Sequence, residues 1–199
     1  MRYLIPLLVI AGGVLAAAGA EPVERDEFSM TLEENIVYPP CSAKKADRLE
    51  GAMKELQRRL QNKKFKTVME RDEQVVCVLI PASELFRANS RELSPEGRTR
   101  LTGLAQFVEH DSQFKVLVAV HSDSTGDERY NDDLTSARAN AIDDFFEATA
   151  GRELNIIPYG LGHDEPVGSD ATKKGRAANR RVEIFFVPTA AYMRSLGAL

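Results

Sequence analysis

The chain has 199 residues, with 26 Lys and Arg, 30 Asp and Glu, and no Trp. This length allows one or two domains with a sizeable core. The mildly acidic balance excludes the broad basic surface that is typical of nucleic-acid-binding proteins. Aromatic residues make up only 7% of the chain, which also argues against platforms for stacking bases. Nucleic acid is therefore not an expected partner.

The first 20 residues are typical of a secretory signal peptide. An apolar body from Tyr3 to Ala18 follows one basic residue, and Ala18-Gly19-Ala20 has the small residues of a cleavage site. We expect cleavage after Ala20, and Glu21 stands where the usual lipid-attachment pattern would have a cysteine. The alternative is an uncleaved anchor, because the apolar run nearly reaches the ~20 residues that span a bilayer.

Residues 21–41 are acidic and weakly patterned, and we expect an extended linker there. A helix is predicted from Ser42 to about Asn62, with an apolar seam of Leu49, Met53, Leu56 and Leu60. The alternating stretch 65–69 and the apolar run 75–80 flank a polar turn and predict a β-hairpin. Residues 42–74 thus form a predicted helix–strand extension, whose seam either packs on the sheet or docks a partner protein.

The exported chain contains two cysteines, Cys41 and Cys77. In an oxidising compartment we expect a disulfide between them, which would close a loop worth about 4 kcal/mol in the chain-entropy model. The alternative is that Cys77, inside the apolar run Val75-Val76-Cys77-Val78-Leu79-Ile80, is a small buried hydrophobic residue.

The second half of the chain alternates strands and helices. Ser94-Pro95 predicts a helix start, with Ser as N-cap and Pro at the first helical position. The inward face of this helix is expected to contain Leu101, Leu104, Ala105 and Val108. The run Phe114 to Val120 has the length and β-branching of a buried strand. Strands are also predicted at 155–159 and 181–187, with a helical turn at 172–179 between them.

Another helix is predicted to start at Asn131, as N-cap, with Asp132 and Asp133 in its first turn. Its expected apolar stripe, which also includes Arg138, is Leu134, Ala137, Ala141, Phe145 and Ala148. The predicted fold class is α/β (an α+β sandwich). A mixed sheet is backed by two main helices in the order βαβαββ, and the helix–strand extension precedes it.

A polar segment begins where the strand Phe114 to Val120 ends. Asp123 lies just past that strand end, where open α/β sheets bind ligands. Gly126 is free to take a positive φ in the turn that follows. Arg138 lies on the inward face of the next helix, where a guanidinium needs an anion or access to solvent. We expect these two charges to converge at one rim. The alternative is an Asx-turn at Asp123 and a purely structural ion pair.

Three motifs together resemble one known family. These are His121-Ser-Asp-Ser-Thr-Gly, the run Asn131…Leu134-Thr-Ser-Ala-Arg138-Ala, and Gly175-Arg-Ala-Ala-Asn179-Arg180-Arg181-Val182-Glu183. The chain resembles the OmpA-like peptidoglycan-binding domain, which is shared with Pal lipoproteins and the periplasmic part of flagellar stator proteins. The resemblance covers residues 75–188 and leaves 189–199 as a C-terminal tail.

The resemblance implies non-covalent binding of the peptide stem of peptidoglycan through its diaminopimelate residue, without a cofactor or metal. It assigns Asp123 and Arg138 to this ligand, and Ser122, Asn131 and Arg180 to the lining of the same pocket. Asn89 matches the strand-end loop that completes the pocket. Arg87 departs from the family pattern, because aspartate or glycine is common at that position.

The chemistry of the ligand agrees with this assignment. The free end of diaminopimelate carries an ammonium and a carboxylate on one carbon, so it needs an anion and a cation a few ångströms apart. We expect a periplasmic wall-binding protein, not an enzyme. The alternative is an accessory subunit of an envelope-spanning secretion or motor complex, in which wall binding is secondary and residues 42–69 contact another protein.

Overall fold

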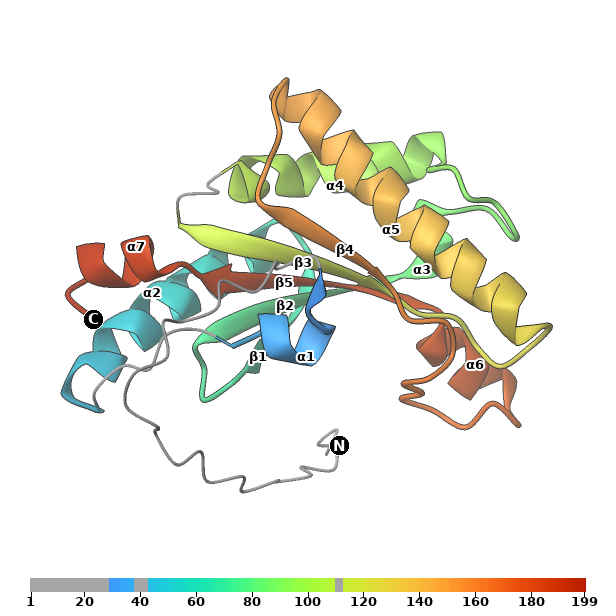
Figure 1. Ribbon diagram of the computed structural model, residues 1–199, viewed down its shortest axis with the longest axis horizontal. Helices are drawn as coiled ribbons and strands as arrows, with labels where there is room; N and C mark the ends of the chain where they lie inside the picture. Colours follow the sequence, from blue (N-terminus) through green and yellow to red (C-terminus); the bar gives the residue numbers. More distant parts are fainter. Residues whose placement is uncertain (1–28, 38–42, 110–112) are drawn as a thin grey trace.

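The computed structural model describes residues 29–37, 43–109 and 113–199 of the chain (Figure 1). The predicted signal peptide, residues 1–20, lies outside these residues, as does Ser42, the expected start of the first long helix. Within the described part of the chain, no helix has the length and apolar character needed to span a membrane.

A mixed five-stranded sheet forms the centre of the molecule and confirms the predicted fold class. The strands follow the order β1-β2-β5-β3-β4. Only β3 and β4 pair in parallel; the other neighbours are antiparallel. The strands are β1 (Lys66–Glu70), β2 (Val75–Pro81), β3 (Phe114–Val120), β4 (Ile156–Gly160) and β5 (Arg181–Pro188). The predicted hairpin is confirmed by the pairing of β1 with β2.

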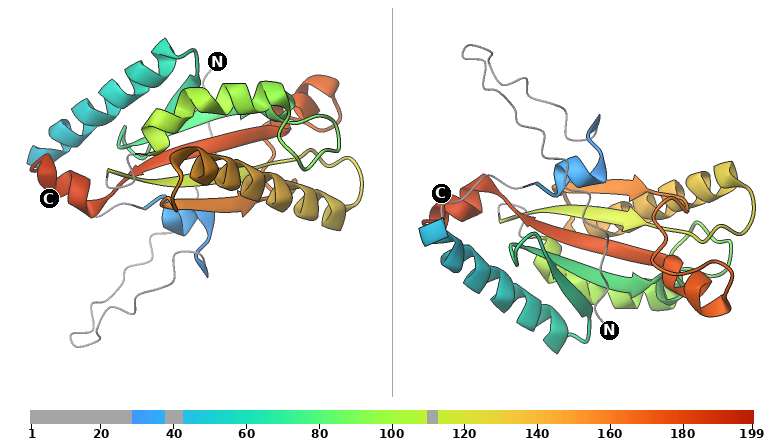
Figure 2. Two further views of the ribbon diagram at one scale, coloured as in Figure 1. Left: turned by 90° about the horizontal axis from the view of Figure 1, so that it is seen from above. Right: turned by 90° about the horizontal axis from the view of Figure 1, so that it is seen from below.

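Three long helices lie over one face of the sheet, as the view from above shows (Figure 2). They are α2 (Ala43–Asn62), α4 (Pro95–Val108) and α5 (Glu128–Ala150). Ser94 caps α4 as predicted, because its hydroxyl accepts a hydrogen bond from Gly97 N at 2.9 Å. The predicted inward face of α4 is confirmed, since all four of its residues are buried. The two main helices behind the domain are thus α4 and α5.

The apolar seam of α2 is part of the same core. All four predicted residues are at most 4% exposed: Leu49, Met53, Leu56 and Leu60. They pack in one cluster with Val76, Val78 and Ile80 of β2. The C-terminal helix α7 (Ala190–Ser195) adds Met193 to this cluster. Of the two interpretations of the seam, the structure therefore supports packing on the sheet and leaves no seam residue for a partner.

The opposite face of the sheet is covered by a short helix that the sequence did not predict. Helix α1 (Leu32–Asn35) begins with a capping box, in which Thr31 and Glu34 satisfy each other's backbone N–H groups. Leu32 and Ile36 belong to a buried cluster with residues of the central strands. Figure 2 shows α1 on the side of the sheet away from the long helices. The expectation of an extended linker over residues 21–41 is therefore wrong for residues 31–36, because two apolar side chains one turn apart provide enough burial to fold this segment onto the sheet.

Polar contacts clamp α1 to the edge of the sheet. The buried amide of Asn35 donates to the hydroxyl of Tyr159 at 2.5 Å and accepts from Lys115 Nζ at 2.8 Å. The Tyr159 hydroxyl in turn donates to the carbonyl of Met30 at 3.1 Å. The position of this segment is therefore set by hydrogen bonds as well as by apolar burial.

Cys77 is a free cysteine and is 2% exposed. It lies on the face of β2 against which the α1 segment packs. Burial raises the pKa of its thiol well above the ordinary value. The other half of the predicted disulfide, Cys41, lies outside the described residues. The free thiol of Cys77 fits the alternative of a small buried hydrophobic residue, and the disulfide stays a prediction.

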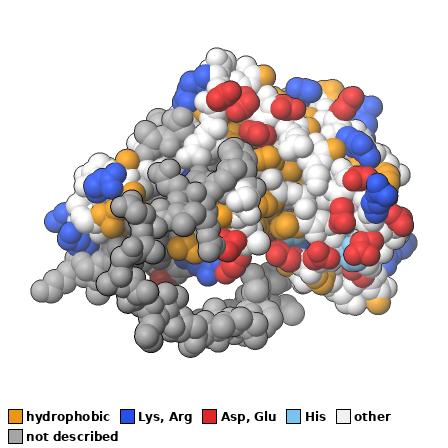
Figure 3. Space-filling model, in the orientation of Figure 1, with side chains coloured by type: hydrophobic (Ala, Val, Ile, Leu, Met, Phe, Trp, Pro, Cys, Tyr) orange, Lys and Arg blue, Asp and Glu red, His pale blue; other side chains and the backbone are white. Residues whose placement is uncertain are grey.

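Two remaining helices lie beside the ends of the central strands. Helix α3 (Ala82–Leu85) follows β2 directly, and α6 (Lys173–Asn179) precedes β5. Acidic side chains gather on the face of the molecule that includes this region (Figure 3). The polar segment that begins at His121 lies here.

Candidate functional site

The three residues after β3 lie in different surroundings. His121 Nε2 lies 3.1 Å from Glu183 Oε2, within the layer of the sheet. The Ser122 backbone N–H donates to the carbonyl of Gly162 at 2.6 Å, and the Ser122 hydroxyl is buried with no hydrogen-bond partner among the described residues. Asp123 turns toward the loop that follows. The side chains diverge, as expected at a strand end, and form no catalytic relay.

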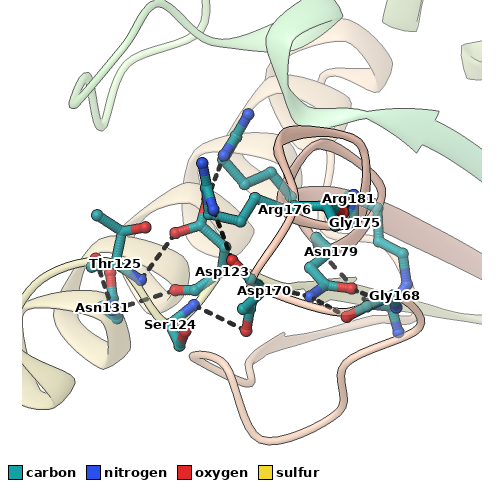
Figure 4. Close-up of polar contacts among 12 residues, drawn as sticks. Asp123, Ser124, Thr125, Asn131, Gly168, Asp170, Gly175, Arg176, Asn179 and Arg181 are labelled. Carbon is teal, nitrogen blue, oxygen red and sulfur yellow. Dashed lines mark hydrogen bonds and ion pairs between the residues drawn. The ribbon is translucent and has the colours of Figure 1, made fainter.

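Asp123 is a buried carboxylate that already has partners on both oxygens (Figure 4). Oδ1 accepts from the Thr125 backbone N–H at 2.8 Å, and Oδ2 forms an ion pair with Arg180. Burial by itself would raise the pKa of Asp123, but the hydrogen bonds from Thr125 and Arg180 hold it below its ordinary value. The carboxylate is therefore an anion that faces one cation.

Gly126 has the positive φ that was predicted, +99°. The Asx-turn at Asp123, which belonged to the alternative interpretation, is also present in the segment before α5. The prediction that Asn131 is the N-cap is wrong. Asp127 caps α5 and accepts from Tyr130 N at 3.0 Å, so the helix starts one turn earlier. Both residues are good N-caps by type, and the sequence alone could not rank them.

Asn131 instead lies inside α5 and is 4% exposed. Its amide donates to the carbonyls of Asp123 at 3.4 Å and Thr125 at 3.3 Å. Asn131 thus fixes the turn that carries Asp123, a positioning contact that the family resemblance did not specify.

The buried face of α5 differs from the predicted stripe. The buried residues are Asn131, Leu134, Thr135, Arg138, Ala139, Ile142 and Phe146. Of the predicted stripe, Leu134 is buried, Ala137, Ala141 and Phe145 are half-buried, and Ala148 is exposed. The larger side chains Ile142 and Phe146 offer more apolar area than the alanines, so the helix turns them inward.

Arg138 is 7% exposed and holds the loop between α3 and α4. Its Nε donates to the carbonyl of Ser90 at 2.8 Å, and Nη2 donates to the carbonyl of Arg87 at 3.2 Å. Its guanidinium carbon lies 4.8 Å from the centre of the Phe86 ring. Burial lowers the pKa of Arg138, yet a guanidinium stays charged in proteins. Among the described residues, Nη1 has no hydrogen-bond partner.

Asn89, the last predicted site residue, lies between the two residues whose carbonyls Arg138 binds. Its φ is +57°, a left-handed conformation that asparagine tolerates better than most residues. Its side chain is exposed. Arg138 therefore positions the Asn89 loop through the main chain.

The structure adds Asp170 and Asn179, which the sequence analysis did not assign to the site (Figure 4). Asn179 is fully buried, and its amide makes four hydrogen bonds of 2.8–2.9 Å: from Val167 N and Gly168 N, and to Gly168 O and Asp170 Oδ1. Asp170 Oδ2 then accepts from the Ser124 backbone N–H at 3.3 Å. The position of Asn179 in the third of the family motifs, Gly175 to Glu183, was the only available signal.

Gly175 is a second residue of that motif whose identity the structure explains. A Cβ atom at Gly175 would lie 2.0 Å from the carbonyl oxygen of Ser169, which is backbone and cannot move aside easily. The loop that carries Asp170 can therefore pack on α6 only if this residue is glycine.

The predicted site residues form two groups. Asn131 and Arg180 each contact the segment of Asp123, while Arg138 contacts the Asn89 loop. No hydrogen bond or ion pair joins Asp123 to Arg138, although both lie in the described part of the chain. The cation that meets Asp123 is Arg180, whose side chain is 48% exposed. The alternative of a structural pair between Asp123 and Arg138 is therefore not what the structure shows.

Residues 85–180 match the family model described as "OmpA family". The outer-membrane lipoprotein YfiB of Pseudomonas aeruginosa is 37% identical over 100 residues, 50% of this chain and 60% of that protein. Peptidoglycan-binding protein ArfA of Mycobacterium tuberculosis is 33% identical over 99 residues, 50% of this chain and 30% of that protein. The chain thus spans 60% of YfiB and 52% of the probable lipoprotein YiaD of Escherichia coli.

Two solved structures resemble the fold. The cell wall anchor of the T6SS from Pseudomonas aeruginosa is 30% identical with a TM-score of 0.56, covering 67% of this chain and 94% of that chain. A putative MotB-like protein from Desulfovibrio vulgaris superimposes with a TM-score of 0.62 at 20% identity, covering 70% of this chain and 96% of that chain. The second likeness concerns the fold alone.

Proposed function

Since the chain belongs to the OmpA family, we propose that it binds peptidoglycan non-covalently in the periplasm and anchors itself, or a partner complex, to the cell wall. The ligand in this proposal is the diaminopimelate residue of the stem peptide. The observation that carries the proposal is the ion pair between buried Asp123 and half-exposed Arg180 at the end of β3.

This pair has the chemistry that the zwitterionic end of diaminopimelate requires. Asp123 supplies a carboxylate for the ligand's ammonium, and Arg180 supplies a guanidinium for the ligand's carboxylate. Because the Arg180 side chain is 48% exposed, it can swing from Asp123 to the ligand without opening the core. The ligand then replaces one ion pair by two.

Arg138 can serve the same ligand. Arg138 keeps Nη1 available while its other donors hold the Asn89 loop. In this proposal Arg138 supports the pocket wall and supplies a second cation.

The expected affinity of a single site is modest. Hydrogen bonds to charged groups contribute about 1.5–3 kcal/mol each, and association costs several kcal/mol in return. One site should therefore bind a free stem peptide with a micromolar to millimolar dissociation constant. A protein held beside a polymeric wall meets many stems at high local concentration, so weak single sites suffice for anchoring.

The alternative is that the chain is an accessory subunit of a secretion or motor complex, for which wall binding is secondary. Its support is the likeness to a T6SS cell wall anchor at 30% identity over 94% of that structure. The seam of α2 is buried in the core, so a partner surface would have to lie elsewhere. In both proposals the domain binds and does not catalyse.

Sedimentation with purified sacculi tests the proposal. Asp123→Ala, Arg138→Ala and Arg180→Ala should each lower the bound fraction, by a factor of about 10 or more for the loss of one charged contact. Asp47→Asn, an exposed position on α2, is the matched control and should bind like the wild type. Far-UV circular dichroism and urea unfolding show whether each variant is folded.

Equal sedimentation of the wild type and of all three site variants would refute the proposed site. Calorimetry with free stem peptides then tests the ligand itself. A lysine-type stem lacks the distal carboxylate, so the arginines lose their partner and its affinity should be lower than that of the diaminopimelate stem.

A further inference from the structure

Thr135 is a fully buried polar residue of α5 that lies one turn after Asn131. A threonine inside a helix commonly turns its hydroxyl back to the carbonyl of the preceding turn. Here Oγ1 donates toward the carbonyl of Asn131 at 2.9 Å, and the carbonyl of Asp132 lies 3.1 Å away. A hydroxyl has one hydrogen and two lone pairs, so the Thr135 oxygen can also accept a hydrogen bond from a donor outside the helix.

That donor is the backbone N–H of Gly162, in the loop that follows β4. Gly162 N lies 3.0 Å from Thr135 Oγ1, and the contact is buried. Helix α5 and the end of β4 are packed closely at this point, because a Cβ atom at Gly160 would lie only 2.2 Å from the backbone nitrogen of Ser136. A buried backbone N–H needs a hydrogen-bond partner, and the Thr135 hydroxyl provides it. Thr135 therefore joins the loop after β4 to α5.

The hydrogen bonds of Thr135 close a ring around the backbone of Asp123. On one side, the carbonyl of Gly162 accepts from the Ser122 backbone N–H at 2.6 Å. On the other side, Asn131, whose own carbonyl binds Thr135, donates from its side-chain amide to the carbonyl of Asp123 at 3.4 Å (Figure 4). Ser122 and Asp123 are neighbours in the chain, so the ring is complete. The backbone is thus held on both sides of the Asp123 carboxylate, and both supports meet at one hydroxyl.

From this ring we propose that Thr135 is a positioning residue for the peptide ligand, which acts through Ser122 and Asn131 and not by contact with the ligand. The inference rests on the proposed function, because the group that it positions is the Asp123 carboxylate. A charged contact keeps its strength only if its partners are held to within about 0.5 Å. Loss of the hydroxyl leaves the buried Gly162 N–H without its partner and frees both supports of the Asp123 turn.

Calorimetry with a stem tripeptide that ends in diaminopimelate tests this inference on the variants Thr135→Val and Thr135→Ser. Valine keeps the branched shape and removes the hydroxyl, so the affinity should fall about ten-fold. Serine keeps the hydroxyl, and its affinity should stay within about two-fold of the wild type. Amide hydrogen exchange at Gly162 and Ser122, measured without ligand, should be about ten-fold faster with valine and nearly unchanged with serine. Thr135→Ala removes the hydroxyl without adding bulk and should behave like the valine variant.

The matched control is Ile142→Val, at a fully buried position of the same helix. It should lower the urea midpoint of unfolding, because a buried methylene is lost, and should bind the tripeptide like the wild type. Wild-type affinity in the valine and alanine variants would overturn the inference and leave the proposed function standing. An equal loss of affinity in Ile142→Val, or no recovery in Thr135→Ser, would show that general stability is responsible and would also overturn it. A wild-type protein that does not bind the tripeptide would refute the proposed function itself, whereas the exchange rates test the ring independently of any ligand.

Discussion

Replacing Asn179 by alanine should loosen the candidate site while leaving the sheet folded. The substitution removes four hydrogen bonds that hold the loop from Val167 to Asp170. Each contributes about 0.5–1.5 kcal/mol, or more where a buried partner is left unsatisfied. Since the loop groups are only partly buried, water can replace some of the lost partners, and we expect a loss of about 2–4 kcal/mol in the free energy of unfolding.

The same substitution should weaken wall binding through the Asp123 segment. Asp170 accepts from Ser124, the residue next to Asp123, so a displaced loop frees the turn that positions the carboxylate. We expect the affinity for the stem peptide to fall about ten-fold, equivalent to about 1.4 kcal/mol. Urea denaturation gives the stability, and calorimetry gives the affinity.

A matched control is Asn140→Ala, an exposed asparagine on α5, which should change unfolding by less than about 0.5 kcal/mol. The urea dependence of the free energy of unfolding, the m-value, should stay constant in both variants, because the exposed surface on unfolding is the same. An Asn179→Ala protein with wild-type stability and wild-type affinity would show that the amide does not organise the site.

The remaining predictions concern stability and dynamics. Burial and the nearby carboxylates of Glu147 and Asp144 raise the pKa of Asp143 to about 6. The folded state thus prefers neutral Asp143, and its stability falls as pH rises from about 4 through 6. Asp143→Asn should therefore stabilise by about 1 kcal/mol at pH 7.5, after discounting for partial exposure, and much less at pH 4. Asp47→Asn, at an exposed position on α2, is the control in urea titrations; equal effects of Asp143→Asn at both pH values would contradict this account. Asn35→Ala should raise amide hydrogen exchange in α1 by about ten-fold, with β3 unchanged, and unchanged exchange in α1 would show that the clamp is dispensable.

The regular elements of this fold were predictable because their signals are local. The seam of α2 and the Ser94-Pro95 start of α4 each depend on residues a few positions apart. Helix α1 was missed because it is only one turn long. Its capping box, Thr31 and Glu34, is a short signal, and the helix depends on packing against the sheet. The start of α5 was misplaced because Asp127 and Asn131 compete on equal terms as caps.

The candidate site was predictable in its members and not in its pairings. Asp123 and Arg180 are 57 positions apart, and nothing between them indicates that Arg180, instead of Arg138, meets the carboxylate. That outcome depends on α3, whose Ala82 binds the Arg180 carbonyl, and on the loop that attracts Arg138 to backbone oxygens. Such choices arise from packing of distant segments, which no local pattern records.

The clamp on α1 has a mechanical consequence for a wall anchor. The N-terminal segment is attached to Lys115, near the start of β3, while Asp123 lies just past the end of the same strand. If Asp123 holds the wall, tension between the upstream chain and the wall runs lengthwise through β3. That strand is hydrogen-bonded on both sides, to β4 and β5, so the load is shared by many bonds in shear instead of opening them one by one.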